Sequence, residues 1–193
     1  KPLLVTVLII ILVVAGFLSV RHFYFQPREV KAQAAMYKGE IYFAKDSFEL
    51  ALKGNGADFV GFEAIADDYS STKAGNLAAA YAGICYYNLG KDAEALAYLK
   101  KFDGDDAFLS PNIEAMIGNC YANMDQYDDA IKAFEKAAKK ADNEMASPIF
   151  LQKAATVAEK MGNYKKALDF YQKIKDEYSQ SMIGRDIDKY IER

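Results

Sequence analysis

The sequence predicts an all-α protein, in which an N-terminal transmembrane helix precedes an α-solenoid of about four helical hairpins and a C-terminal capping helix. Two observations carry this expectation. Residues 3–20 form an almost unbroken apolar run. Residues 76–179 can be laid over themselves three times, with the same residue types at the same offsets. A fixed period of this kind is typical of stacked helical units.

The apolar run matches a membrane span in length. As a helix rising about 1.5 Å per residue it would extend roughly 27 Å, close to the thickness of the hydrocarbon core of a bilayer. A cleavable secretory signal is the alternative. The run is longer than the ~7 to 15 residues of a typical signal core, and no small-x-small cleavage site follows it. We therefore expect an uncleaved single-pass anchor, without a lipid-acceptor cysteine before Cys85.

A basic and aromatic cluster follows the span. Rings with an apolar body and a polar or charged tip suit the headgroup layer. We predict that four side chains lie at the membrane interface: Arg21, Phe23, Tyr24 and Phe25. Pro27 is expected to interrupt the helix, so that the anchor and its exit occupy residues 1–27.

The charges beside the span leave the membrane orientation open. Lys1 precedes the span, whereas Arg21, Arg28 and Lys31 follow it, which by itself favours a cytoplasmic C-terminal side. Because the chain does not begin with Met, residues before Lys1 would belong in this count.

Residues 28–193 are predicted to form one repeat domain. Its three clear copies have internal steps of 3, 4, 5, 4 and 3 residues and lie 35 and 37 residues apart. The aligned residues are Gly83, Tyr86, Gly90, Ala95, Leu99 and Phe102, then Gly118, Tyr121, Asp125, Ala130, Phe134 and Ala137, then Ala155, Ala158, Gly162, Ala167, Tyr171 and Ile174.

Each copy has a physical interpretation as a helical hairpin. The leading small residue leaves a notch on the first helix, and a tight turn follows, where glycine tolerates left-handed dihedral angles. The alanine then lets the second helix approach closely, and the bulky residue four positions later fills the space beside the notch. A single hairpin cannot bury both of its faces, so successive hairpins are expected to stack.

This pattern resembles the tetratricopeptide repeat, whose period is about 34 residues. The resemblance implies an array that binds other proteins. The repeats are expected at 73–107, 110–142 and 147–179. A first hairpin at 28–70, whose small-residue signature has degenerated, would precede them, and a capping helix at 181–193 would follow.

Local signals predict where several helices begin and end. The first hairpin would consist of helices at 30–52 and 58–69, separated by the turn at 54–56. Thr72 would cap the next helix, and Ser110 and Ser147, each followed by proline, would be N-caps. The last helix would cover the final hairpin with one apolar face, formed by Ile183, Ile187, Tyr190 and Ile191.

Composition argues against catalysis and against nucleic-acid binding. Residues 29–193 carry 21 basic and 27 acidic side chains, so a basic nucleic-acid surface is not expected. The one histidine, His22, lies at the predicted membrane edge, and no glycine-rich phosphate loop occurs. We expect no enzyme activity, cofactor or metal. Cys85 and Cys120 should be buried free thiols, because equivalent positions on stacked helices lie about 8 to 10 Å apart, beyond disulfide reach.

The inner wall of the array is the expected binding surface. In the tetratricopeptide family this wall is formed by first-helix residues that point away from the notch. The residues predicted to bind a protein there are Tyr87, Asn88, Asn119, Asn123 and Gln152. Asparagine amides can pair with the backbone of an extended peptide. Alternatively, the asparagines only hydrate the wall. Alanines at two inner positions, Ala80 and Ala115, argue against a carboxylate clamp.

The layout of anchor and acidic array resembles the ancillary subunit of the SecYEG translocon. That resemblance rests on the architecture and on residues 33–69. It implies a single-pass protein of the bacterial inner membrane, with its repeats in the periplasm. Its implied partners are the Sec translocon, a membrane-anchored periplasmic prolyl isomerase or chaperone, and newly exported proteins. A cytoplasm-facing adaptor and an envelope assembly factor are the alternatives.

Overall fold

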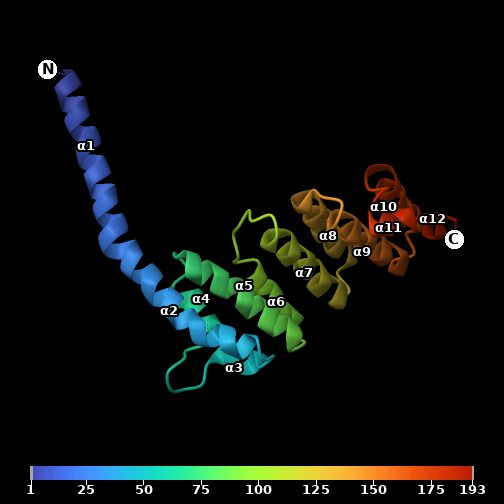
Figure 1. Ribbon diagram of the computed structural model, residues 1–193, viewed down its shortest axis with the longest axis horizontal. Helices are drawn as coiled ribbons and strands as arrows, with labels where there is room; N and C mark the ends of the chain where they lie inside the picture. The colour runs from blue at the N-terminus through green and yellow to red at the C-terminus, as the bar shows by residue number, and fades with distance from the viewer. Residues whose placement is uncertain (1, 193) are drawn as a thin grey trace. The chain divides into compact units, whose positions relative to one another are not determined.

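The computed structural model describes residues 2–192, and all of the regular structure within this range is helical (Figure 1). It divides into two compact units, one ending at Cys85 and the other beginning at Tyr86. The first unit contains α1 (Pro2–Val20), η1 (Arg21–Phe25), α2 (Gln26–Phe43), α3 (Phe48–Lys53), α4 (Phe62–Asp68) and most of α5 (Lys73–Asn88).

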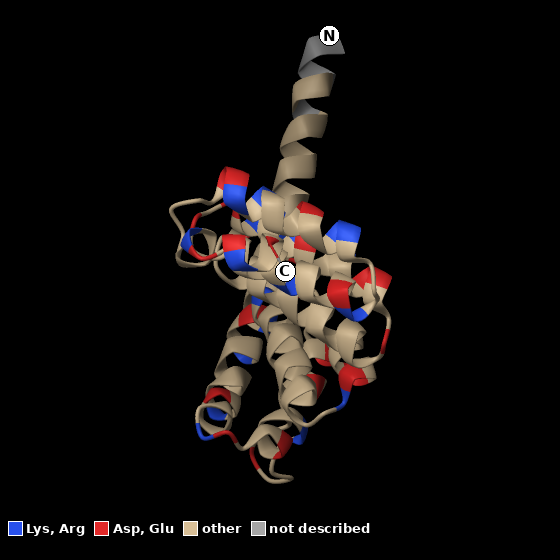
Figure 2. Cartoon of the chain, turned by 90° about the vertical axis from the view of Figure 1, so that its right-hand side faces the viewer, with Lys and Arg blue, Asp and Glu red and all other residues tan. Residues whose placement is uncertain are grey.

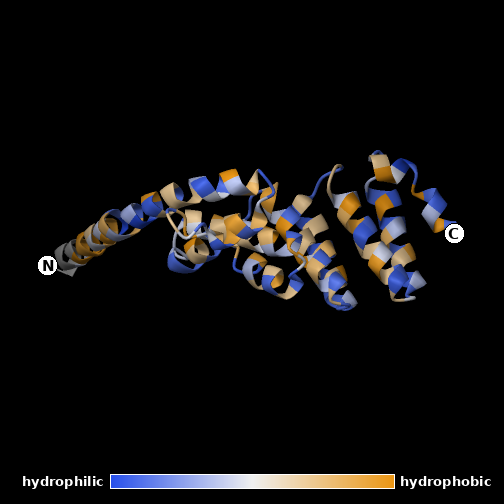
Figure 3. Ribbon diagram, turned by 90° about the horizontal axis from the view of Figure 1, so that it is seen from below, coloured by the Kyte–Doolittle hydropathy of each residue, from blue (hydrophilic) through white to orange (hydrophobic). Residues whose placement is uncertain are grey.

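The N-terminal elements α1, η1 and α2 form one continuous helix. The described part of α1 carries no charged residue (Figure 2) and is apolar along its length (Figure 3). By length and composition, the stretch Ile9–Phe43 of this helix could cross a membrane, and none of its most apolar window is buried against the protein. The N-terminal apolar helix that the sequence predicts is confirmed.

Pro27 does not interrupt this helix, so that expectation was wrong. Proline lacks an N–H, and its ring crowds the carbonyl group four residues earlier, here that of Phe23. The five residues before Gln26 adopt a π-helix, and the N–H of Gln26 donates to the carbonyl oxygen of Arg21. This wider turn changes the pattern of hydrogen bonds just before the proline, which lets the helix continue.

The first hairpin differs from the predicted pair of long helices. The helix expected over 30–52 ends at Phe43 and restarts at Phe48, and the helix expected over 58–69 begins only at Phe62. The break occurs because Asp46 adopts a left-handed conformation (φ +54°), and the N–H of Ser47 donates to the carbonyl oxygen of Tyr42 at 2.9 Å. Such a bond closes a helix C-terminus.

The repeat signature of this hairpin is preserved in its first half, contrary to expectation. The steps of 3, 4 and 5 residues recur at Gly39, Tyr42, Asp46 and Ala51. Gly39 is the notch, because a Cβ added there would lie 2.6 Å from the ring of Phe62. Ala51 is fully buried. Only the bulky position is displaced, because residues 54–61 form a loop between α3 and α4.

That loop leaves and returns at nearly the same point. Gly54 (φ +84°) and Gly61 (φ +89°) lie against each other, and a Cβ added at Gly61 would come within 2.2 Å of the carbonyl oxygen of Leu52. The side chain of Asn55 accepts hydrogen bonds from three successive backbone N–H groups, those of residues 57–59, each at 3.1 Å. The loop therefore inserts residues into the repeat and lets α4 continue the role of the second helix.

The turns of all four hairpins share one geometry. The left-handed residues fall at the same position of each repeat: Asp46, Gly90, Asp125 and Gly162. The N–H of each following residue donates at 2.9 Å to a carbonyl oxygen five residues earlier, in the pairs Ser47–Tyr42, Lys91–Tyr86, Gln126–Tyr121 and Asn163–Ala158. This agreement supports the alignment of the three predicted copies and adds a fourth.

The second unit contains the remaining helices in chain order. They are α6 (Asp92–Leu99), α7 (Leu109–Asn123), α8 (Tyr127–Ala141), α9 (Ser147–Lys160), α10 (Tyr164–Glu177), α11 (Met182–Arg185) and α12 (Asp188–Ile191). From α6 to α11 each packs on the next, and α12 packs on α10. The predicted notch residues Gly83, Gly118 and Ala155 are all buried. At Gly118 the ring of Phe134 fills the space that a Cβ would occupy, at 2.7 Å.

The helix caps are partly as predicted. Thr72 does cap α5, because its hydroxyl oxygen accepts from the N–H of Gly75 at 3.0 Å. Ser110 and Ser147, in contrast, lie inside the first turns of α7 and α9 and are buried. The capping oxygens belong to Asp106 and Asn143, which accept backbone N–H groups just before each helix. The two helices therefore begin earlier than the serines suggested.

The C-terminal cap consists of two short helices instead of one. The chain turns at 186–187, between α11 and α12. Ile187 is buried in the core of the second unit, and the other three apolar residues of the predicted face pack against that core. The predicted covering face is confirmed, although the helix that carries it is divided.

We expect Gly118→Leu to destabilise the second unit by about 2 kcal/mol or more, because the new side chain would have to displace the ring of Phe134. Asn112→Leu adds the same side chain to an exposed position of α7 and should change stability by less than about 0.5 kcal/mol. Thermal unfolding followed by circular dichroism measures both. Equal melting temperatures for the two variants would contradict the close packing of the Phe134 ring against Gly118.

Candidate functional site

Two hollows lie along α7 and α9 in the second unit. Each has a volume of about 440 Å³. The first hollow is lined by the N-terminal halves of both helices and by the loops that precede them. The second is lined by the C-terminal halves, together with Phe134, Tyr171 and Tyr190. Asn119, Ile149 and Lys153 line both.

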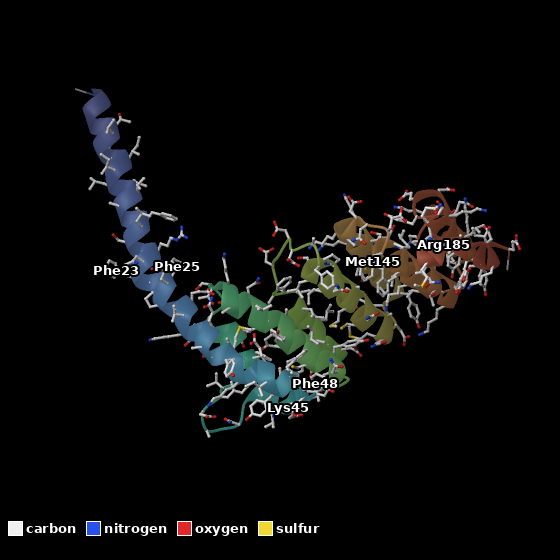
Figure 4. The ribbon with its side chains drawn as sticks, in the orientation of Figure 1. Phe23, Phe25, Lys45, Phe48, Met145 and Arg185 are labelled. Carbon is white, nitrogen blue, oxygen red and sulfur yellow. The ribbon has the colours of Figure 1, made fainter. Side chains whose placement is uncertain are left out.

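The first hollow has strongly apolar edges. Phe108 and Met145 occupy equivalent positions, three residues before the proline of each first helix, and their exposed fractions are 80% and 79%. Met145 is labelled in Figure 4. Ile149 adds a third exposed apolar side chain. Side chains of this kind are available to pack against an apolar ligand.

A polar bridge separates the two hollows. The ammonium group of Lys153 donates to the side-chain oxygen of Asn119 at 3.1 Å and lies 5.6 Å from the centre of the Phe134 ring. Among residues 2–192 it forms no ion pair. This bridge therefore places a cation without a carboxylate partner in the middle of the wall. Nothing in the sequence alone singles out Lys153, although it directly follows Gln152.

The structure brings together only some of the residues predicted to bind a protein. Asn119 and Gln152 line the second hollow. Tyr87 and Asn123 lie instead beside Asp92, whose carboxylate accepts from the amide of Asn123 at 3.0 Å. Burial, followed by the charges of Cys120 and Asp92, raises the pKa of Tyr87. Asn88, the last residue of α5, is exposed.

A third hollow continues from the second toward the C-terminus. Its volume is about 620 Å³, and α9, α10 and α12 line it. The rings of Tyr171 and Tyr190 stack with their centres 5.2 Å apart and line both hollows. The C-terminal helix therefore contributes an aromatic wall to this surface in addition to covering the last hairpin.

The predicted membrane-interface residues all lie on η1. Phe23, Tyr24 and Phe25 have exposed fractions of 78%, 54% and 40%, and Arg21 is also exposed. Figure 4 shows Phe23 and Phe25 projecting from the helix. Their position next to the apolar run is as expected, and their contact with headgroups stays a prediction.

Both cysteines are buried free thiols, as predicted. Burial raises the pKa of Cys85 to about 12 and is also the main cause of the rise at Cys120, again to about 12. A protonated, buried thiol is a poor nucleophile. Within residues 2–192, no group of three or more histidine, cysteine or acidic side chains is arranged to hold a metal ion.

Comparison with known proteins identifies the repeats. Tetratricopeptide-repeat profiles match three segments, at residues 81–103, 115–144 and 151–181. The structure is also similar to the crystal structure of MamA, with a TM-score of 0.54 and 19% identity, over 80% of this chain and 90% of that chain. At this identity the likeness shows the fold alone. None of the curated proteins that were compared matches the chain.

The chain therefore contains tetratricopeptide repeats and, ahead of them, an apolar helix that could span a membrane. Such repeats are typically non-catalytic scaffolds that bind other proteins. The first hairpin lies outside the matched segments, and its membership rests on the shared turn geometry.

We expect the native thiols to resist Ellman's reagent at pH 8, because both stay protonated and buried. Once the chain is unfolded in guanidinium, both thiols should react. Thiols in the unfolded chain ionise near their ordinary pKa of 9.0, but the folded ones ionise only near 12. Stability should therefore fall as pH rises between these values. Rapid labelling of the native protein would contradict the burial.

Proposed function

We propose that the protein is a membrane-anchored scaffold that binds other proteins through the inner surface of its repeats. The observation that carries this proposal is the row of hollows along α7 and α9, with the Lys153–Asn119 bridge between two of them. Apolar edges beside a few fixed polar groups suit a peptide, whose side chains need pockets and whose backbone needs hydrogen-bond partners.

More specifically, the protein is an ancillary subunit of the Sec translocon in the bacterial inner membrane, with its repeats in the periplasm. There it assists newly exported proteins together with a membrane-anchored prolyl isomerase or chaperone. Support comes from the layout: one apolar helix, an aromatic exit at η1, and repeats that carry more acidic than basic side chains. The second candidate is a cytoplasm-facing adaptor, favoured by the basic residues just after the span.

Purification of the native complex in mild detergent should recover translocon and folding-factor subunits. Replacing Asn119 and Gln152 together by alanine should weaken binding roughly thirtyfold, because two hydrogen bonds of about 1 kcal/mol each are lost. Gln172→Ala removes an exposed amide on α10, outside the hollows, and should have no effect. Undiminished recovery with the double variant would contradict protein binding along α7 and α9. Absence of translocon subunits would contradict only the Sec assignment.

Orientation can be measured separately. Alkaline phosphatase fused after the last residue folds only outside the cytoplasm, whereas a green fluorescent protein fused there reports the cytoplasm. We expect an active phosphatase and a dark fluorescent fusion. The reverse pattern would favour the cytoplasm-facing adaptor, and it would leave the protein-binding role of the repeats intact.

A further inference from the structure

The outer face of α2 carries an apolar stripe that no other element of the first unit covers. It consists of Val30, Ala34, Tyr37 and Ile41, all exposed, with exposed fractions of 65% for Val30 and 66% for Tyr37. The buried residues of this helix, Ala32, Met36 and Gly39, lie on another face. Polar residues are the rule on the open end of a repeat array, so this stripe is unusual.

The spacing of the stripe is that of a helix pair. Its steps of 4, 3 and 4 residues alternate as the apolar positions of a heptad do in two helices wound around each other. A stripe of this period fits best against another stripe of the same period. A second copy of the same chain supplies one.

With the membrane span at residues 3–20, as the sequence predicts, lipid would not reach this stripe. Val30 follows the end of the apolar run by ten residues, which places it roughly 15 Å further along the helix. The headgroup layer of one leaflet is only about 5 to 8 Å thick. A helix that leaves the membrane along its axis therefore carries the stripe into water.

Charge along the two flanks of the stripe favours a parallel partner. One flank of the stripe carries Lys31 and Lys38, and Lys45 lies in line with them just beyond the end of the helix. The other flank carries Gln33 and Glu40. Lys38 already pairs with Asp58. Among residues 2–192, Lys31, Lys45 and Glu40 have no ion-pair partner.

In a parallel pair, the flank of one helix faces the opposite flank of its neighbour. Glu40 of each copy would therefore meet Lys45 of the other. An antiparallel pair would bring lysines against lysines. The anchor assigned under the proposed function imposes the same direction, because both copies leave the membrane at the same residue.

We propose that α2 pairs in parallel with α2 of a second copy through this stripe, so that the protein acts as a dimer whose two repeat arrays stand side by side above one membrane. The pairing uses surfaces that are distinct from the hollows along α7 and α9.

Disulfide trapping in native membranes tests the pairing. Val30→Cys and Tyr37→Cys place a thiol on the stripe, and each should form a disulfide-linked dimer on mild oxidation, because paired positions come within the ~7 Å that a disulfide allows. Lys31→Cys is the matched control, one residue away and equally exposed to oxidant, but turned to the flank. We expect at least tenfold less dimer with it. Cys85 and Cys120 are buried and contribute no background.

A second variant distinguishes specific pairing of α2 from random collision between copies in the membrane. Adding Tyr37→Glu to Val30→Cys places like charges opposite each other and should abolish the trapped dimer, while the circular dichroism spectrum stays unchanged because Tyr37 is exposed. Equal amounts of disulfide-linked dimer from Val30→Cys and Lys31→Cys would overturn the proposal. So would a Val30→Cys adduct with a different protein. Extraction with alkaline carbonate tests the anchor independently of both outcomes.

Discussion

The structure depends on a small residue at one position in the first helix of each repeat, which is Gly39, Gly83, Gly118 or Ala155. At Gly39 and Gly118 an aromatic ring from the second helix occupies the space of the missing Cβ, at 2.6 and 2.7 Å. Seven residues later the chain reverses through a left-handed residue, as at Asp46 and Asp125. The turn lies at a constant sequence spacing from the notch. The buried alanine of the second helix therefore packs against the first helix in each repeat. Each hairpin is thereby closed by contacts between its own two helices.

This closure determines which surface remains for binding. The notch face of each first helix is used by its own hairpin, and the flanks are used by the neighbouring hairpins. Only the inner face is left, and along α7 and α9 it carries the hollows and the Lys153–Asn119 bridge. The bridge holds the Lys153 ammonium group in place through the amide of Asn119, without neutralising its charge.

Sequence periodicity predicted those parts of the fold that follow from local spacing. The steps from Gly118 to Phe134 could be identified because every contact lies within one hairpin. The first hairpin was harder, because residues 54–61 move the bulky partner of Gly39 from the expected position to Phe62. The groove was only partly predictable for a different reason. Whether an inner residue faces a hollow, as Asn119 does, or a neighbour such as Asp92, as Asn123 does, depends on distances between helices.

Several contacts join the N-terminal helix to the first repeat, and no periodicity in the sequence reveals them. The π-turn of η1 lets the helix continue past Pro27, so that α1, η1 and α2 form one continuous helix. Arg28 then lies between the rings of Tyr24 and Tyr69 and donates to the backbone of Asp68. The carboxylate of Glu29 accepts the first N–H groups of α5, at 2.7 and 3.2 Å. These contacts join the first repeat directly to the helix that bears the apolar stripe.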